Sequence, residues 1–248
     1  MQRNADSPLY GRRAFVLGGT GGIGREIARA LGLLGAQLDV HGREPHKLKA
    51  ALLGFRKAGI EAEGSAFPLE TFEDARSLLA RAGLADILVP AWGPFLQKPL
   101  HETAADEWET AALFNLALPG ALISAALPGM RIRGWGRILL LGGTRTDGIR
   151  GFRGNAAYAA AKTGLGTLAK SVASGYSRDG IAALVLCPGF VRTEYLAPET
   201  LEDLASKTPL GRLTDPRDFG NLAADLLCRE PPLWNGAILT ADEGLAAW

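Results

Sequence analysis

Two side chains in the middle of the chain have the types and the spacing that proton-transfer chemistry requires. Tyr158 and Lys162 are four residues apart in a stretch, Ala156–Tyr176, with helical spacing of its apolar residues, so both lie on one helix face. A free tyrosine has a pKa of about 10, and a nearby ammonium group favours the phenolate and lowers that pKa. Tyr158 could therefore act as a general acid or base that Lys162 tunes. The alternative is an amphipathic helix with a half-exposed tyrosine and a solvated lysine.

A glycine-rich segment near the N-terminus stands where a nucleotide cofactor would bind. Gly18-Gly19-Thr20-Gly21-Gly22-Ile23-Gly24 follows an expected strand, Ala14–Leu17, and opens an expected helix, Ile23–Leu34. Because glycine has no Cβ, backbone N–H groups and the positive helix end can approach a pyrophosphate closely. We therefore expect a dinucleotide against Gly18, Thr20, Gly22, Ile23 and Gly24; the alternative is a tight turn without a ligand.

The end of the second expected strand indicates which dinucleotide fits. Where an NAD-binding fold places an acidic residue to accept from the ribose hydroxyls, this chain has His41-Gly42-Arg43. Gly42 leaves room and Arg43 offers a fixed fork of donors, which favours a 2′-phosphate and therefore NADP over NAD. The alternative is a surface Arg43 that pairs with Glu44, and Asp39 lies near enough in sequence to confuse the register.

Short aliphatic runs alternate with helical stretches along the whole chain. The expected strands are Ala14–Leu17, Gln37–His41, Ala62–Phe67, Asp86–Ala91, Arg137–Leu141, Ala182–Leu186 and Ala237–Ala241, and the expected helices are Ile23–Leu34, Pro45–Lys57, Thr71–Ala82, Ala104–Leu127, Ala156–Tyr176 and Pro216–Leu227. Repeated βα units predict an α/β fold, a single Rossmann-type domain over residues 1–248 with a doubly wound sheet of about seven parallel strands and helices on both faces. The polar segment at about 190–215 breaks the alternation, and we expect it to contact the substrate.

Composition and charge exclude several classes of protein. The 248 residues include 27 Lys plus Arg and 26 Asp plus Glu, so the chain lacks the excess of basic residues that is typical of a nucleic-acid binder. Its hydrophobic fraction of 47% is too high for a disordered protein. Cys187 and Cys228 are too few for a disulfide framework, and we expect no metal site. The start lacks the apolar core of a secretory signal, so we expect a cytoplasmic location. We interpret the uncharged stretch Thr110–Met130 as a buried helix, not a membrane span, because polar residues and prolines interrupt it.

The order and spacing of these motifs resemble the short-chain dehydrogenase/reductase family over nearly the whole chain. The matching residues are Gly18, Gly22, Gly24, Asn115, Tyr158, Lys162, Pro188, Gly189, Thr193, Asn235, Gly236 and Asp242. The resemblance implies that Tyr158 exchanges the proton of a carbonyl/alcohol pair while hydride passes to or from a nicotinamide, and that Lys162 holds the nicotinamide ribose. It also implies cofactor contacts from Gly93, Pro188, Gly189, Val191 and Thr193, and a relay water on the Asn115 carbonyl. Pro119 has no N–H to donate to that carbonyl, which leaves it free.

Two segments depart from the family pattern. The family's catalytic serine usually lies thirteen residues before the tyrosine; that position is Arg145 here, whereas counting from Gly136 gives Gly143. Because a threonine hydroxyl can donate the same hydrogen bond, we expect Thr144 to replace the serine, with Thr146 second and loss of the role third. Pro90-Ala91-Trp92-Gly93 stands where the family commonly has Asn-Asn-Ala-Gly, so the links there must be remade, and Trp92 packs on the cofactor or fills a gap.

These expectations combine into one leading function and one rival. The leading function is an NADP(H)-dependent oxidoreductase that interconverts a carbonyl and a secondary alcohol, with Thr144 as donor to the carbonyl; Pro209-Leu210-Gly211-Arg212-Leu213 gives a weak resemblance to the 3-oxoacyl-carrier-protein reductases. The expected partner is an apolar or medium-sized small-molecule carbonyl, with neither nucleic acid nor membrane. The rival is a non-catalytic nucleotide-binding protein, a sensor or partner subunit, and two threonines turned away from the cleft would favour it. The expected helices Ala104–Leu127 and Ala156–Tyr176 are apolar over too much of their circumference for surface helices, so we expect a homo-oligomer, a tetramer or dimer.

Overall fold

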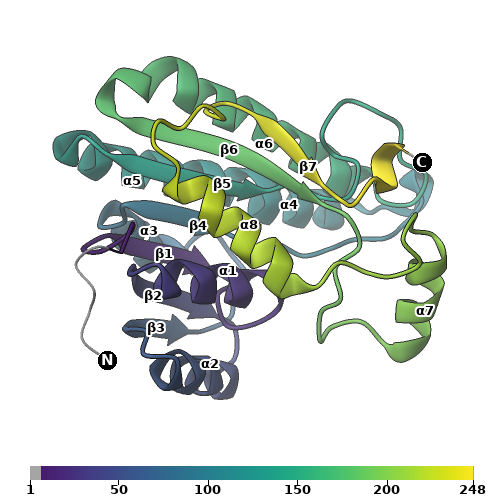
Figure 1. Ribbon diagram of the computed structural model, residues 1–248. Helices are drawn as coiled ribbons and strands as arrows, with labels where there is room; N and C mark the ends of the chain where they lie inside the picture. The colour runs from purple at the N-terminus through teal and green to yellow at the C-terminus, as the bar shows by residue number, and fades with distance from the viewer. Residues whose placement is uncertain (1–6, 248) are drawn as a thin grey trace.

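A seven-stranded parallel sheet forms the centre of the computed structural model, which describes residues 7–247 (Figure 1). The strand order is β3-β2-β1-β4-β5-β6-β7, so the direction of the crossovers reverses between β1 and β4. The strands are β1 (Arg13–Leu17), β2 (Gln37–Gly42), β3 (Ala62–Ala66), β4 (Ile87–Pro90), β5 (Gly136–Leu141), β6 (Ile181–Pro188) and β7 (Ile238–Ala241). The expected doubly wound fold is confirmed. The first residues, on which the expectation about a secretory signal rests, lie largely outside the described residues.

Helices cover the sheet on both faces (Figure 1). Their bounds are α1 (Gly22–Leu33), α2 (Pro45–Lys57), α3 (Arg76–Gly83), α4 (Ala105–Ala112), α5 (Leu118–Arg133), α6 (Ala156–Tyr176), α7 (Pro198–Ser206) and α8 (Pro216–Cys228), with short 3₁₀ turns at Leu100–Glu102, Ser177–Asp179 and Leu245–Ala247. Because side chains alternate along a strand, Phe15 of β1 packs into one core with α3, α5 and α6, whereas Val16 packs into a second core with α1, α2 and α8. Both faces of the sheet are therefore buried.

The helix expected over Ala104–Leu127 is divided in the structure. A π-helical turn, η2 (Leu113–Ala117), joins α4 to α5, and in it the N–H of Leu118 donates to the carbonyl of Leu113, five residues back. Pro119, which cannot donate a backbone hydrogen bond, follows directly. The wide turn thus includes Asn115, at the place where the sequence predicts a free carbonyl.

The continuous helical stretch Ala105–Arg133 is long and apolar enough to cross a membrane by length and composition. In the structure it packs against α3, β4 and β5, and 44% of its most apolar window is buried. The other part of its apolar surface faces outward. That uncovered surface is the basis of the predicted association of subunits.

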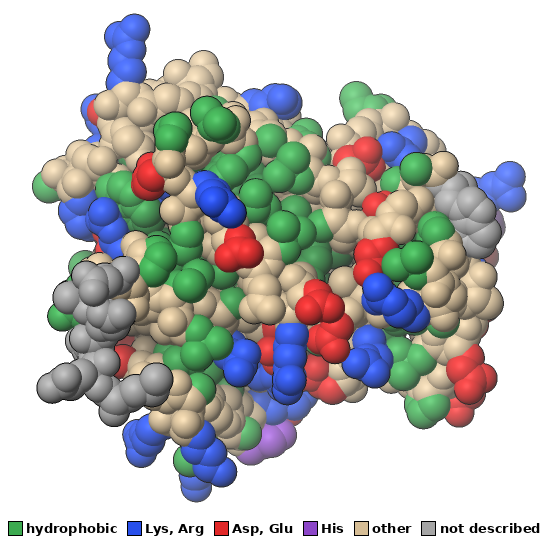
Figure 2. Space-filling model, viewed as in Figure 1, with side chains coloured by type: hydrophobic (Ala, Val, Ile, Leu, Met, Phe, Trp, Pro, Cys, Tyr) green, Lys and Arg blue, Asp and Glu red, His purple; other side chains and the backbone are tan. Residues whose placement is uncertain are grey.

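The segment expected to contact the substrate, at about 190–215, leaves the sheet after β6 and is closed at its base. Val191 pairs with Thr214 in an isolated parallel bridge, and the Thr214 N–H donates to the Phe190 carbonyl at 2.9 Å. Between these residues the chain projects from the body of the molecule and carries α7 (Figure 1). Acidic and basic side chains gather where the projection meets the body (Figure 2), and ion pairs there join Arg25 to Glu194 and Arg192 to Asp215.

Candidate active site

A cavity of about 420 Å³ lies at the carboxyl ends of the parallel strands. The loops that follow β1 to β6 all contribute to its wall, which is where open α/β sheets bind ligands. The predicted site residues that line it are Gly18, Thr20, Gly22, Ile23, Gly24, Arg43, Gly93, Tyr158, Lys162, Pro188 and Thr193. Four other predicted residues, Asn115, Thr144, Gly189 and Val191, are not among the residues of the wall.

The glycine loop brings β1, the cavity and α1 together without side chains in between. A Cβ at Gly24 would lie 2.4 Å from the Gly18 carbonyl oxygen, and a Cβ at Gly18, whose φ is +81°, would lie 2.9 Å from the Cβ of Trp92. Helix α1 begins at Gly22 without a side-chain cap, so its first N–H groups and positive end are directed toward the cavity. The loop therefore has the form of a cradle for phosphate groups.

Two neighbouring residues of the projecting segment cover this cradle. One oxygen of Glu194, Oε1, accepts a hydrogen bond from the Gly22 N–H and another from the Arg25 guanidinium, each at 3.1 Å. Burial acts against the charged form of Glu194, but the backbone N–H donors and Arg25 outweigh it and lower its pKa. Tyr195 lies over Gly21, where a Cβ would lie 2.0 Å from the tyrosine hydroxyl. The sequence analysis did not single out Glu194, and nothing local in the sequence links it to a loop 172 residues away.

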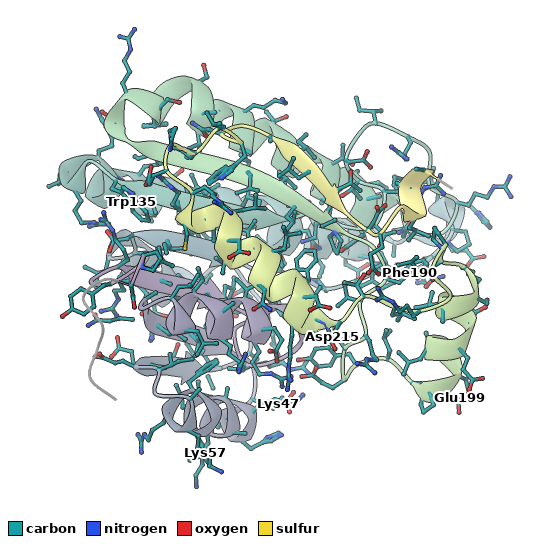
Figure 3. All side chains as sticks on the ribbon, viewed as in Figure 1. Lys47, Lys57, Trp135, Phe190, Glu199 and Asp215 are labelled. Atoms are coloured by element: carbon teal, nitrogen blue, oxygen red, sulfur yellow. The ribbon has the colours of Figure 1, made fainter. Side chains whose placement is uncertain are left out.

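Arg43 lies at the edge of the cavity, and its position is compatible with both interpretations made from the sequence: contact with a 2′-phosphate and pairing with Glu44. It lines the cavity, and its guanidinium donates to Glu44 Oε1 at 3.1 Å. Lys47, labelled in Figure 3, donates to the same carboxylate at 2.9 Å and is a second cation beside the cavity. Gly42 is required here because a Cβ would lie 2.1 Å from the Thr20 hydroxyl oxygen.

Asp39, the acidic residue that could have confused the register, does not take part in this site. Its side chain is 1% exposed, and its carboxylate accepts hydrogen bonds from Arg13 at 3.0 Å and from Arg81. Asp39 is absent from the cavity wall. After the end of β2, Arg43 and the Glu44 carboxylate that it pairs with both face the cavity, whereas Asp39 does not.

Tyr158 and Lys162 project from α6 into the same cavity, as their spacing predicts. The Lys162 Nζ is buried, donates to the Leu141 carbonyl at 2.9 Å and lies 5.7 Å from the centre of the Tyr158 ring. Burial lowers the pKa of Lys162 to about 8. Burial also raises the pKa of Tyr158 to about 12, with a smaller contribution from Cys187. The expected lowering of the Tyr158 pKa by Lys162 is not seen in this structure, where desolvation raises that pKa and the phenol keeps its proton at neutral pH.

Asn115 is fully buried next to the wall of the cavity. Its Nδ2 donates to the Pro94 carbonyl at 3.1 Å, and its Oδ1 has no hydrogen-bond partner within residues 7–247. Gly93 makes room for it, since a Cβ there would lie 2.2 Å from Asn115 Oδ1. The π turn therefore places an amide that ties down the segment after β4.

The segment after β4 remakes the links that the family pattern supplies through asparagines. Pro90 pairs with Leu17 in the ladder between β4 and β1, and the Ala91 N–H donates to the Leu17 carbonyl at 2.8 Å. Trp92 both lines the cavity and packs edge-on against Phe114, with ring centres 5.1 Å apart. Both functions expected as alternatives for Trp92 are thus compatible with its position.

The segment after β5 bonds both candidate threonine hydroxyls to backbone groups, and neither threonine lines the cavity. Thr144 Oγ1 donates to the Gly189 carbonyl at 3.3 Å. Thr146 is 2% exposed, and its Oγ1 accepts from the Gly143 N–H at 2.8 Å and donates to the Gly143 carbonyl at 3.0 Å. Gly143 itself faces Tyr158. A serine-like role for Thr144 stays a prediction, and these hydrogen bonds give it no support.

The remaining predicted cofactor residues divide between the cavity and the structure behind it. Pro188 and Thr193 line the cavity. Gly189 packs against β7's end, where a Cβ would lie 3.0 Å from the Asp242 Cα, and Val191 is buried in its bridge with Thr214. Gly189 and Val191 therefore shape the base of the projecting segment.

Comparison with known proteins agrees with this geometry. The short chain dehydrogenase family matches residues 12–203. The chain is 30% identical to the gluconate 5-dehydrogenase of Gluconobacter oxydans, over 96% of this chain and 95% of the relative, and 26% identical to an Arabidopsis thaliana tropinone reductase homolog, At5g06060, over 95% and 92%. The crystal structure of a 3-oxoacyl (acyl-carrier-protein) reductase from Agrobacterium tumefaciens C58 with NADP bound superimposes with a TM-score of 0.86 at 26% identity, covering 95% of this chain and 94% of that one. The chain belongs to the short chain dehydrogenase family.

Proposed function

We propose that this protein is an NADP(H)-dependent oxidoreductase that interconverts a carbonyl and a secondary alcohol. The observation that carries the proposal is that Tyr158 and Lys162 open into the same cavity as the glycine cradle and Arg43. A proton-transfer pair and a dinucleotide cradle in one cavity suit hydride transfer coupled to proton transfer. The named relatives, a dehydrogenase and two reductase-type proteins, support the same reaction class.

The residues present fit NADP(H), which supplies or accepts the hydride when bound. Gly18, Gly22 and Gly24 would hold the pyrophosphate at the start of α1, and Arg43 with Lys47 beside it would hold the 2′-phosphate. Asp39 of β2 is absent from the cavity wall, and Glu44, the carboxylate beside Arg43, is paired with Arg43 and Lys47; this arrangement supports NADP over NAD. The Agrobacterium structure has NADP bound, which supports the same cofactor here.

Tyr158 is the residue that would exchange the proton with the substrate. In reduction its hydroxyl donates a hydrogen bond to the carbonyl oxygen and then gives up the proton; in oxidation the phenolate takes the proton of the alcohol. Its high pKa suits the donor role at neutral pH. Lys162 would bind the nicotinamide ribose and stabilise the phenolate once it forms, and the Asn115 carbonyl in the π turn would hold the water that returns the proton.

The substrate we propose is a small or medium-sized carbonyl compound bound between the projecting segment and Phe95, whose ring packs edge-on against Tyr158 at 5.0 Å. We place the enzyme in the cytoplasm as a homo-oligomer associated through the outward apolar surface of α4 to α6. Sedimentation at micromolar concentration checks this association, and a monomeric mass would contradict it.

One observation favours the rival, a nucleotide-binding protein without catalysis. Both threonine hydroxyls are occupied by backbone groups and do not line the cavity. Against it, Tyr158 remains open to the cavity.

Parallel titrations with NADPH and NADH, read by thermal unfolding, test the cofactor first. A ligand at about a hundred times its Kd adds roughly 2.7 kcal/mol to the unfolding free energy. Stabilisation by NADPH, followed by carbonyl-dependent NADPH oxidation that Tyr158→Phe abolishes, is the expected result. Binding without turnover on any carbonyl would favour the rival, and no binding of either nucleotide would refute both.

A further inference from the structure

Gly143 lies directly against the ring and hydroxyl of Tyr158. It follows β5 by two residues, and counting along the chain from Gly136 assigns it the place of the family's serine. A Cβ built on Gly143 would lie 2.9 Å from Tyr158 Cε1, 3.2 Å from its hydroxyl oxygen and 3.4 Å from Thr146 Cγ2. The space above Gly143 is therefore filled by the phenol, and neither a methyl group nor a hydroxymethyl group fits there without a shift.

The backbone of Gly143 is held from the other side. Its N–H donates to Thr146 Oγ1 and its carbonyl accepts from both the Thr146 N–H and Oγ1, at 2.8 to 3.1 Å. Arg145, inside this tight turn, has a φ of +62°, a left-handed conformation that non-glycine residues rarely adopt. Because Thr146 is buried and joined to Gly143 by three hydrogen bonds, the turn resists the movement that a larger side chain at position 143 would need.

The phenol has neighbours on the sides away from Gly143. Tyr158 lies on α6 with the Phe95 ring packed edge-on at 5.0 Å, and the Lys162 ammonium is fixed to the Leu141 carbonyl behind it. The hydroxyls of Thr144 and Thr146 are bonded to backbone carbonyls, and neither residue lines the cavity into which Tyr158 projects.

We propose that Gly143 is a positioning residue: its missing side chain seats Tyr158 directly against the end of β5, and Tyr158 is the single side-chain donor to the substrate carbonyl. The inference rests on the proposed function and narrows it. Without a side chain, position 143 supplies no second hydroxyl donor, and the phenol lies in the space that such a side chain would fill. A hydroxyl restored at position 143 would therefore displace the phenol and would not assist it.

The kinetic test compares Gly143→Ala and Gly143→Ser with Gly151→Ala, a glycine of the same loop with no atom near its missing Cβ. Since a displacement of about 1 Å can cost roughly a hundredfold in rate, both Gly143 variants should lose about tenfold or more in kcat with little change in KM or in NADPH affinity, and should agree with each other within about threefold. Gly151→Ala should behave as the wild type. A Gly143→Ser enzyme faster than the wild type, or far faster than Gly143→Ala, would overturn the proposal.

A second measurement does not depend on turnover and so separates this proposal from the proposed function. If the clash is with Tyr158, Gly143→Ala should lower the melting temperature by about 5 °C in the wild-type background and by much less when Tyr158→Ala has removed the ring. Equal losses in the two backgrounds would show that Gly143 does not act through Tyr158. A protein that binds no NADPH but shows this coupling would refute the proposed function and leave the contact between Gly143 and Tyr158 intact.

Discussion

Replacing Lys162 with methionine should stabilise the protein while it removes activity, and the gain should depend on pH in a defined way. Lys162 is 6% exposed, and its only hydrogen bond to a protein group in the described chain is the one to the Leu141 carbonyl. Burial lowers its pKa from 10.5 to about 8, so at pH 7 folding must keep a charge in a poorly solvated place. At about 1.36 kcal/mol for each pH unit, this lowering corresponds to a penalty of about 3 kcal/mol in the unfolding free energy.

The sign follows from proton counting. Between about pH 8 and 10.5 the folded protein has released the Lys162 proton while the unfolded chain still holds it, so wild-type stability should rise across this window relative to a variant without the lysine. Loss of the hydrogen bond to Leu141 offsets about 1 kcal/mol, so Lys162→Met should be more stable by about 2 kcal/mol at pH 7. That advantage should disappear by pH 10.

Urea unfolding of both proteins at pH 7, 8, 9 and 10 measures this difference, in which the other titrating groups cancel. Lys170→Met is the matched control, because Lys170 is an exposed lysine of the same helix. A difference between wild type and Lys162→Met that stays constant from pH 7 to pH 10 would refute the argument, since it would mean that Lys162 carries no burial penalty.

Three further outcomes follow from the geometry of the site. Tyr158→Phe should lower kcat at least a hundredfold with unchanged NADPH affinity. The wild-type rate of carbonyl reduction should fall above about pH 8, where Lys162 loses its proton, and not only near pH 12, where Tyr158 does. A rate that stays constant up to pH 10 would contradict this. Glu194→Gln should bind NADPH about three- to tenfold more tightly in a fluorescence titration, because the Glu194 carboxylate lies on the first N–H of α1 where a diphosphate would bind, whereas Glu199→Gln on α7 (Figure 3) should change nothing; weaker binding by Glu194→Gln would show that the carboxylate assists the cofactor. Asp39→Asn should cost about 3 kcal/mol in urea unfolding by leaving Arg13 and Arg81 without their shared carboxylate, and should leave NADPH affinity unchanged; a large change in affinity would place Asp39 in the cofactor site.

The features that the sequence predicted best are those that depend on local patterns of residues. Strands of β-branched and aliphatic residues separated by helical spacing fix the order of elements, and once the fold is a doubly wound sheet the carboxyl ends of its strands must meet at one edge. The approach of Gly18, Arg43 and Tyr158 to one cavity follows from this alone. Their roles in binding and catalysis remain proposals.

What the sequence could not predict depends on contacts between distant segments or on competing energies. The contact of Glu194 with Gly22 joins residues 172 apart, and no local pattern records it. The pKa of Tyr158 was expected to fall because spacing reveals the neighbouring charge but not the depth of burial, which dominates in the structure. The choice between Thr144, Thr146 and neither depends on a turn whose left-handed Arg145 lies outside ordinary propensities.

The bridge between Val191 and Thr214 has a consequence for how such a protein can diversify. It fastens both ends of the projecting segment to one point beside β6, so the residues between them form a loop that is closed at its base. Lengthening a closed loop costs little entropy, about 0.6 kcal/mol for each doubling. The part of this loop around α7 could therefore be exchanged for that of a relative to alter which substrate is admitted, while Thr193, Glu194 and Tyr195 keep their places beside the cofactor cradle.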